Sequence, residues 1–271
     1  MNYCFWNLNN HDLADLLYDL VDEQEIDLIF LAECNLKPAD VLRKLNRDTN
    51  AFYFCAGIAC DKIQIYTKFK DSLLGLLSET RRMTARYLYS PVLNNNITLL
   101  CLHLPSKLHW TGDDQAAYLL GVKSFIDSVE SLVGHKQTVV FGDFNMHPFE
   151  HGLVQSGGFH TTFERAIARR LVRRVEGVEY DFFYNPMWGF LGDLGKGKVS
   201  GTHYYSPAKP INYHWNLFDQ VIMRPGLIDY FDDGYLDIVT EIKGTSLLTE
   251  AGLIDSRHFS DHLPIKFCFN L

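Results

Sequence analysis

Four acidic residues end or interrupt apolar runs, where a rigid strand could position them: Glu33, Asp143, Asp219 and Asp261. A buried carboxylate is costly unless it is paired, hydrogen-bonded or bound to a cation. One such residue alone is most simply interpreted as exposed or as a cap. These four, however, are accompanied by two asparagines and two histidines, Asn7, Asn145, His103 and His262. Oxygen donors of this kind suit Mg²⁺, or Mn²⁺, together with a substrate phosphate.

The sequence GDFN at residues 142–145 combines a flexible backbone with two polar side chains. Because glycine adopts conformations that other residues avoid, Gly142 is expected to let the chain turn sharply after the preceding strand. Asp143 and Asn145, two residues apart in an extended chain, would then project to the same side. A carboxylate there can orient and deprotonate a water, and the amide can donate to the nucleophile or to a phosphate oxygen.

The sequence SDH at residues 260–262 places an acid directly before a histidine. Adjacent side chains in an extended chain point to opposite faces, so Asp261 and His262 are not expected to pair with each other. His262 therefore needs another acidic partner, and Asp219 is the candidate. Such a pair raises the histidine pKa and keeps an imidazolium near a phosphate. A single histidine is more often a satisfied core or surface residue, but its position before an apolar strand favours function here.

Patterns of apolar residues predict the elements that position these side chains. Strands are expected at residues 2–7, 26–32, 51–56, 62–67, 73–78, 86–90, 97–104, 138–141, 218–223, 235–239 and 264–269. Helices are expected at residues 11–24, 38–45 and 113–133. The four strands between 51 and 90 are expected to form a meander. Residues 148–216, rich in Pro, Gly and aromatics, should form a helix and long loops, so chain 1–271 is predicted to be a single α/β domain.

Composition argues against some classes of protein. The net charge of −8 is unlike that of a protein that coats duplex nucleic acid through a wide basic surface. It does not exclude a nuclease, because a bound cation and local arginines can attract phosphate. No apolar stretch of about 18 residues occurs, and the N-terminus does not read as a secretory signal, so no stable membrane association is expected. Six cysteines without disulfide-dense spacing indicate buried free thiols and a cytoplasmic location.

Six polar motifs follow one another at the ends of the predicted strands: WN at 6–7, LAE at 31–33, LHLPSK at 102–107, VVFGDFN at 139–145, NLFDQVIM at 216–223 and FSDHLPI at 259–265. In this order they resemble the endonuclease/exonuclease/phosphatase superfamily, which includes deoxyribonuclease I-like enzymes. The resemblance spans nearly the whole chain. It implies an α/β fold, a four-layer sandwich in which two packed mixed β-sheets are flanked by helices. It also implies hydrolysis of phosphate esters with Mg²⁺ or Mn²⁺.

The resemblance further implies a role for each matching residue. Glu33 would be the principal metal ligand, assisted by Asn7 directly or through water. Asp261 would bind the metal or support the histidine pair. Asp143 would hold the attacking water, and Asn145 would bind the nucleophile or the phosphate.

Three more residues are expected to act at the phosphate by the same resemblance. His103 would contact the scissile phosphate, and Asp219 would pair with His262, which would stabilise the transition state of an in-line attack. Two departures bear on the substrate. Inositol polyphosphate 5-phosphatases typically carry PAWCDR where this chain has HWNLFDQ at 214–220, which argues against inositol phosphates. The RIDY-like motif of abasic-site endonucleases is also absent from the sequence.

Basic and aromatic residues between GDFN and FDQ are candidates for substrate binding. On a helix, the sequence ERAIARRLVRR at 164–174 would place Arg165, Arg169 and Arg173 on one stripe that could contact a phosphate backbone. The alternative is a solvated face paired with nearby glutamates. Eight aromatic residues could stack on unpaired bases, or could simply pack the loops: Phe182, Phe183, Tyr184, Trp188, Tyr204, Tyr205, Tyr213 and Trp215. Of these, Tyr184, Trp188, Tyr205 and Trp215 are the preferred candidates for substrate binding.

Three kinds of function remain open from the sequence. The first is a nuclease, an endonuclease or exonuclease that hydrolyses DNA or RNA, so that nucleic acid is the expected partner. The second is a phosphatase or phosphodiesterase acting on a small-molecule or lipid-headgroup phosphate ester, which the acidic balance favours slightly. The third is a catalytically silent binding module. Mutually repelling carboxylates argue against the third, because a silent protein has no physical reason to keep them.

Overall fold

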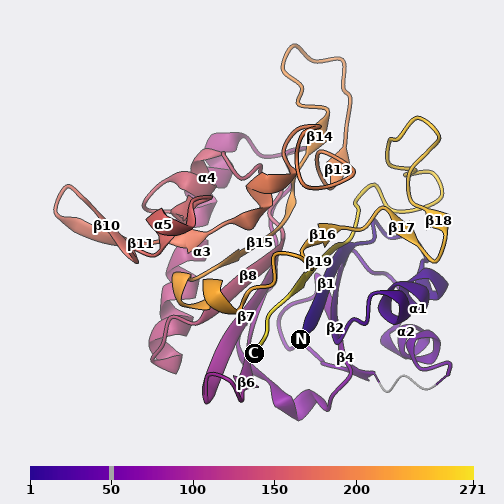
Figure 1. Ribbon diagram of the computed structural model, residues 1–271, viewed down its shortest axis with the longest axis horizontal. Helices are drawn as coiled ribbons and strands as arrows, with labels where there is room; N and C mark the ends of the chain where they lie inside the picture. The colour runs from indigo at the N-terminus through magenta and orange to yellow at the C-terminus, as the bar shows by residue number, and fades with distance from the viewer. Residues whose placement is uncertain (49–51) are drawn as a thin grey trace.

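The computed structural model describes residues 1–48 and 52–271, and two large mixed sheets dominate it (Figure 1). The six-stranded sheet has the order β16 (Asp237–Ile238), β19 (Ile265–Cys268), β1 (Asn2–Asn7), β2 (Leu28–Ala32), β4 (Ile63–Thr67) and β3 (Tyr53–Phe54). The seven-stranded sheet has the order β5 (Leu74–Thr80), β6 (Met83–Ser90), β7 (Asn95–His103), β8 (Thr138–Asp143), β15 (Asp219–Met223), β12 (Phe183–Tyr184) and β9 (Thr161–Thr162). Each sheet contains parallel and antiparallel pairs. The predicted four-layer arrangement of two mixed sheets and helices is confirmed.

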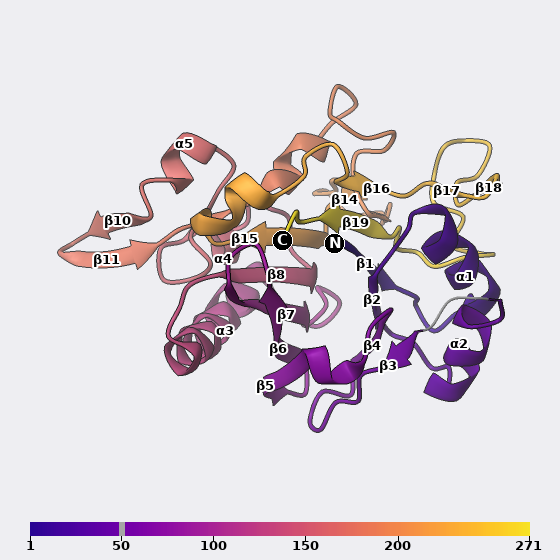
Figure 2. The ribbon, with the colours of Figure 1, turned by 60° about the horizontal axis from the view of Figure 1, so that its bottom comes forward.

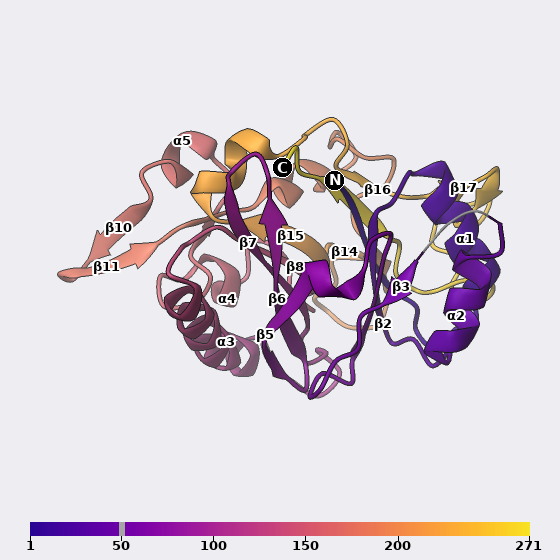
Figure 3. The ribbon, with the colours of Figure 1, turned by 90° about the horizontal axis from the view of Figure 1, so that it is seen from below.

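Helices cover the outer face of each sheet (Figures 2 and 3). α1 (Ala14–Glu23) and α2 (Pro38–Leu45) lie beyond the six-stranded sheet, and α1 buries Leu17, Leu20 and Val21 at helical spacing. α3 (Gly112–Val133) lies against the seven-stranded sheet. Thr111 caps its N-terminus in a capping box, and Gly134 ends it in a left-handed conformation. Among the described helices, none is both long and apolar enough to cross a membrane.

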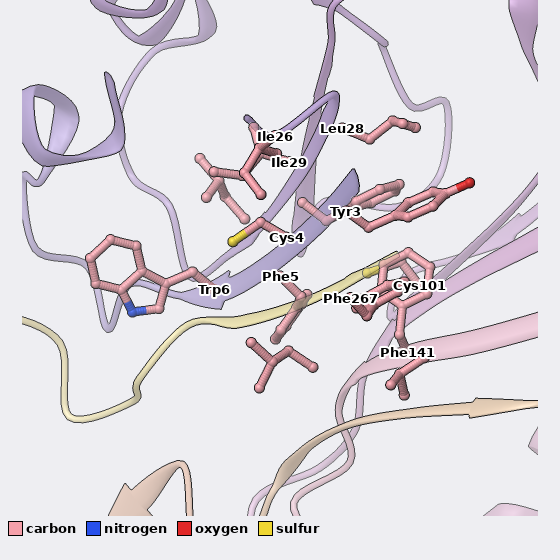
Figure 4. Packing of buried hydrophobic residues seen from close by; sticks show 14 of the residues in the cluster. Tyr3, Cys4, Phe5, Trp6, Ile26, Leu28, Ile29, Cys101, Phe141 and Phe267 are labelled. Carbon is pink, nitrogen blue, oxygen red and sulfur yellow. The ribbon is translucent and has the colours of Figure 1, made fainter. Parts of the chain in front are cut away.

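Aromatic side chains fill the space between the two sheets. The ring centroids of Phe30 and Phe141 lie 4.7 Å apart, and those of Phe141 and Phe267 lie 5.1 Å apart, so that strands of both sheets meet in one cluster. Tyr3 stacks on Phe267 at 5.1 Å. Figure 4 shows Cys4 of the same strand on the opposite side of the backbone, as strand alternation requires. This packing fixes how the sheet edges that carry the polar motifs face each other.

The chain ends meet in the six-stranded sheet, where β1 pairs antiparallel with β19. The N-terminal amine of Met1 donates a 2.8 Å hydrogen bond to the carbonyl of Phe269. Both termini lie close together in Figure 1. The first and last polar motifs are therefore neighbours in space.

Most predicted elements are present, but two interpretations are wrong. Strands β3 and β4 do not join a meander with β5, because β4 pairs with β2 in the other sheet. Residue 51 of the predicted strand 51–56 lies outside the described residues.

The second wrong interpretation is the helix predicted for the arginine-rich segment 164–174. α5 (Arg165–Ala168) ends after one turn, because Leu171 takes a left-handed φ of 67°. The chain then forms a hairpin of β10 (Val172–Val175) and β11 (Val178–Asp181), with Gly177 in its turn. Arg165, Arg169 and Arg173 consequently do not share one helical stripe.

Short elements replace the long loops expected at residues 148–216. They include α4 (His151–Val154), the 3-10 helix η2 (Pro186–Phe190), and the hairpin of β13 (His203–Tyr204) with β14 (Trp215–Asn216). Outside this segment lie the 3-10 helices η1 (Asp71–Leu73), before β5, and η3 (Pro225–Tyr230), and the hairpin of β17 (Glu241–Ile242) with β18 (Thr245–Ser246). The loop between β13 and β14 extends from the molecule at the top of Figure 1. This loop lies beside the polar ends of the central strands.

Candidate active site

Sheet register places three predicted residues in one row across neighbouring strands. His103 on β7 is opposite Asp143 on β8, and Asp143 is opposite Asp219 on β15. Side chains of directly paired residues lie on the same face of a sheet. All three are buried, and Nε2 of His103 is 3.7 Å from Oδ2 of Asp143. The row brings together residues that are more than a hundred positions apart in the sequence.

The six-stranded sheet contributes Asn7, at the end of β1, and Glu33, just after β2. Nδ2 of Asn7 donates to Oε1 of Glu33 at 3.3 Å and to Oδ2 of Asp143 at 3.1 Å. Oε1 of Glu33 is also 3.5 Å from Nε2 of His103. Because the Asn7 oxygen accepts from the amide of Asn9 at 3.0 Å, this side chain offers nitrogen to the carboxylates. In this orientation, Asn7 positions Glu33 and Asp143.

The pairing expected for His262 is present. Nδ1 of His262 lies 2.7 Å from Oδ2 of Asp219. The backbone of His262 is held on both sides: its amide donates to Oγ of Ser260 at 3.0 Å, and its carbonyl accepts from Nε1 of Trp6 at 2.8 Å. Ser260 in turn donates to the carbonyl of Asn7 at 2.6 Å. The chain therefore fixes the imidazole before any substrate arrives.

Burial and charge act in opposite directions on this pair. Burial lowers the pKa of His262, but the carboxylates of Asp219, Asp143 and Asp261 outweigh it and raise the pKa to about 10. Burial also raises the pKa of Asp219, although the imidazolium lowers it in part. At neutral pH the shared proton is therefore held mainly by the histidine, and His262 is an imidazolium.

Asp261 lies beside His203, while Glu33, the other acidic residue expected to bind the metal, contacts His103 and Asn7. Oδ2 of Asp261 is 3.7 Å from Nε2 of His203, and its Oδ1 has no hydrogen-bond partner among the described residues. Burial raises the pKa of Asp261, but the neighbouring imidazoles of His203 and His262 together lower it by more, so the net shift of the pKa is downward. His203 has no assigned role from the sequence, yet its ring centroid is 4.8 Å from that of His262.

Two groups of side chains in this region could hold a cation. One consists of His203, Asp261 and His262, and the other of Asp143, Asp219 and His262; in each, the candidate ligand atoms lie within 4.8 Å of one another. The oxygen atom of Asp261 without a partner and the partly exposed carboxylate of Glu33 add donors that suit a hard divalent ion. Both groups contain His262, which cannot ligate a cation while it is an imidazolium, so the carboxylates of Glu33 and Asp261 are the donors that fit a divalent cation.

In the GDFN motif, Asp143 and Asn145 both line the site as expected, but the backbone geometry differs from the expected one. Gly142 lies inside β8, not in a turn, with a φ of 136°. A Cβ there would meet the carbonyl oxygen of Leu102 at 2.0 Å, so glycine allows β7 and β8 to approach closely. Asn145 has a left-handed φ of 51°, and its backbone amide donates to Oδ1 of Asp143 at 2.8 Å. A turn, and not an extended chain, thus brings the two side chains together.

A cavity of about 640 Å³ opens over this row. Its floor contains the polar residues Glu33, His103, Asp143, Asn145, Asp261 and His262. It is also lined by residues 106–108 and by the β13–β14 hairpin. Nδ2 of Asn145 donates to the carbonyl of Leu104 at 3.0 Å, which leaves one N–H and the side-chain oxygen of this amide.

Of the six residues expected to bind substrate, Tyr205 lines the cavity. Arg165 forms an ion pair with Asp233, and Arg169 forms one with Asp229. The remaining three lie outside the cavity lining in the part of the chain that the structure describes: Tyr184, Trp188 and Trp215. Tyr184 is buried beside Arg165, Trp188 packs on Phe163 at 4.7 Å between ring centroids, and Trp215 packs on Tyr204 at 5.4 Å.

Sequence reasoning missed several residues of the site. His203 and Ser260 are described above, and the hydroxyl of Thr202 accepts from the amide of Asp219 at 3.1 Å. Nε2 of His147 lies 3.0 Å from Oδ1 of Asn216, and both line the cavity. Ser260 lies inside the FSDHLPI motif and His147 lies two residues after GDFN, so their positions are the signal that could have found them. His203 lies in a segment without clear periodicity.

Comparisons with known proteins add evidence at the level of the fold. No family model and no curated protein matches the sequence. Solved structures do match over the whole chain. An endonuclease/exonuclease/phosphatase family protein from Leptotrichia buccalis is 12% identical with a TM-score of 0.56, and each chain is covered to 100%.

Two further structures were determined with DNA. D. rerio TDP2, complexed with a single-strand DNA product, is 16% identical with a TM-score of 0.55, covering 100% of this chain and 99% of that one. The 3′ phosphatase NExo from Neisseria, bound to a product DNA hairpin, is 13% identical with a TM-score of 0.54, and both chains are covered to 100%. At these identities the similarity describes architecture. The chain therefore has the fold of the endonuclease/exonuclease/phosphatase structures.

Proposed function

We propose that this protein is a phosphoesterase dependent on Mg²⁺ or Mn²⁺ that hydrolyses nucleic-acid phosphodiester bonds. The observation that carries the proposal is the row of His103, Asp143 and Asp219 across three strands, completed by His262 and faced by Glu33. Two aspartates, two histidines and the separate carboxylate of Glu33, positioned by rigid strands, suit the hydrolysis of a phosphate ester. The similar structures that hold DNA support nucleic acid as the substrate class.

Residues of this chain account for each requirement of an in-line attack. Asp143, whose Oδ1 is held by the amide of Asn145, accepts the proton of the attacking water. The water oxygen bonds to phosphorus while the bond to the leaving oxygen breaks. His103 and the imidazolium of His262 donate to the phosphate oxygens, where negative charge increases. Glu33, with Asp261 as a further donor, would hold a divalent cation, which would neutralise part of that charge.

The proposal is tested by incubating the protein with labelled single-stranded and double-stranded DNA and RNA in Mg²⁺, Mn²⁺ or EDTA. Cleavage is expected with a metal and not with EDTA. Asp143→Asn and His262→Ala should each reduce kcat by about 10²- to 10⁴-fold, the range for removal of an acid–base group. Both variants should retain the circular dichroism spectrum of the wild type.

Absence of cleavage of every polymer, by folded protein with metal, would overturn the nuclease assignment. Small phosphate esters would then be assayed with the same variants. Cleavage that persists in both Asp143→Asn and His262→Ala would instead remove these residues from the mechanism.

A further inference from the structure

The active-site cavity shares a wall with a second cavity of about 370 Å³. Glu33, His103 and Ser106 line both. On the side of the second cavity, the wall continues through Arg82, Lys62 and Trp110. The predicted phosphate-binding residue His103 thus lies between two open spaces.

Two basic side chains of the second cavity, Lys62 and Arg82, lie near His103 without an ion-pair partner among the described residues. Asp61 also lines this cavity, but it lies 3.4 Å from Nε of Arg81. By contrast, Arg165 and Arg169 are paired with aspartates. Two free cations beside His103 are suited to a second phosphate group.

Aromatic rings stand on both sides of the shared wall. Trp110 lines the second cavity and is braced edge-on by Tyr118, with ring centroids 5.4 Å apart. Tyr205 and Tyr213 line the active-site cavity, and more than half of each side chain is exposed. Exposed rings next to unpaired cations are typical of surfaces that bind unpaired nucleic acid, because every base has a face on which a ring can stack.

We propose that a single nucleic-acid strand runs through both cavities, with the scissile phosphate over Glu33 and His103, so that the protein cuts internal bonds of unpaired strands. This inference rests on the proposed function and adds to it the position of the bond along the polymer. A terminal phosphate or a small ester would occupy one cavity and leave the cations of the other without a partner. A strand that continues past the cleaved bond engages Lys62, Arg82 and Trp110 on one side and Tyr205 and Tyr213 on the other.

A closed circular single strand tests the position of cleavage, because it has no end. Wild-type protein with Mn²⁺ is expected to linearise circular single-stranded DNA or RNA at least as readily as it degrades a linear strand of the same sequence. A circular duplex should be cut more slowly, since its bases cannot stack on the rings. Degradation of linear strands from an end, with circles left intact, would overturn the inference while the proposed function stands.

Variants at the second cavity test which residues hold the strand. Trp110→Ala and Lys62→Ala should each lower kcat/KM for the circular strand by about 5- to 100-fold, from the usual strength of a base stack or a phosphate contact. Neither should change the hydrolysis of bis(p-nitrophenyl) phosphate, a small diester without bases. These two positions are preferred to Arg82, whose guanidinium donates to the carbonyl of His103 at 3.3 Å and so touches the catalytic row.

Tyr89→Ala is the matched control. Tyr89 is an exposed aromatic residue near the C-terminal end of β6, far along the strand from Arg82, and it is opposite Asn96 of β7 in the sheet register. The substitution should leave both reactions unchanged. If Trp110→Ala and Lys62→Ala behave like Tyr89→Ala on the circular strand, the second cavity does not bind substrate and the inference is wrong. If wild type hydrolyses the small diester but no strand, the nuclease assignment fails together with this inference.

Discussion

A buried and an exposed version of the same interaction occur in this chain. Asp219 and His262 are 2.7 Å apart in the site, and Asp255 and His258 are 2.8 Å apart on the surface. Water screens the exposed pair, so it contributes little to stability. Burial removes that screening from the inner pair, so the charge on His262 depends mainly on Asp219, with smaller contributions from Asp143 and Asp261.

Asp219→Asn is expected to reduce kcat by about 10²- to 10⁴-fold, because the amide cannot hold His262 as an imidazolium. Initial rates on a labelled oligonucleotide measure the effect. Asp255→Asn, the same change at the exposed pair, should leave kcat unchanged. An Asp219→Asn protein that is folded and fully active would contradict the role given to this pair.

Strand geometry explains why one partner could be predicted and another could not. Adjacent side chains on an extended chain point apart, so the sequence excluded Asp261 as the partner of His262 and left Asp219. His203 meets Asp261 across the isolated bridge that it forms with His262. Such a contact depends on how a hairpin folds back over the sheet, and no local pattern encodes it.

At the scale of single elements, Gly142 allows β8 to lie close to β7. Gly142→Ala is expected to lower the free energy of unfolding by about 3 kcal/mol or more, because its Cβ would overlap the carbonyl of Leu102. Urea denaturation measures the change. The control is Gly121→Ala on the exposed side of α3, where a Cβ meets nothing within 4 Å. This substitution should stabilise by about 0.5–1 kcal/mol, and an equal loss in both proteins would refute the steric explanation.

Glu79 on β5 stabilises the loop at residues 58–60 through hydrogen bonds. Its carboxylate accepts from the amides of Ile58 at 2.7 Å and Ala59 at 2.8 Å and lies 3.4 Å from the guanidinium of Arg86. Burial raises the pKa of Glu79, but the hydrogen bonds outweigh it, so the pKa falls below its ordinary value of 4.5. The ionised group therefore stabilises the fold above about pH 4.5, and this contribution is lost as the pH falls through the lowered pKa.

Glu79→Gln should lower the free energy of unfolding at pH 7 by about 1–3 kcal/mol. Between pH 5 and pH 3, the range in which ordinary carboxyl groups titrate, the free energy of unfolding of Glu79→Gln should change less than that of the wild type. Denaturation curves across this range provide the measurement. Parallel pH profiles for the two proteins would show that Glu79 does not titrate differently on folding.

Continuous apolar runs predicted β2, β7 and β8 well, since burial on both faces leaves little choice of structure, and alternation predicted β1. Their partners were harder to predict, because pairing is a long-range property. β4 follows the rules of a strand but joins β2 and not β5. The helix prediction for the arginine-rich segment was wrong for a local reason: the left-handed conformation of Leu171 and the turn at Gly177 override the helical spacing of the arginines.

The whole molecule depends on its last strand. β19 lies between β16 and β1, and its Phe267 packs on Phe141 of the other sheet. We infer that the two sheets fold as one unit. Deletion of residues 265–271 should therefore abolish cooperative thermal unfolding, measured by calorimetry, because it exposes β1 and opens the core. Deletion of Leu271 alone is the control and should preserve the transition. Retention of a cooperative transition by the longer deletion would show that the sheets are independent.

The hydrogen bond between Met1 and Phe269 also makes the path of the chain almost a closed ring. Where two ends of a polymer are already together, the order in which its segments are synthesised need not be the order in which they occur. A circular permutant with these ends joined by a short linker, and opened in the exposed loop between β13 and β14, would keep every strand pairing described above. In such a protein the last motif of the site would be made before the first, and the catalytic row would still assemble.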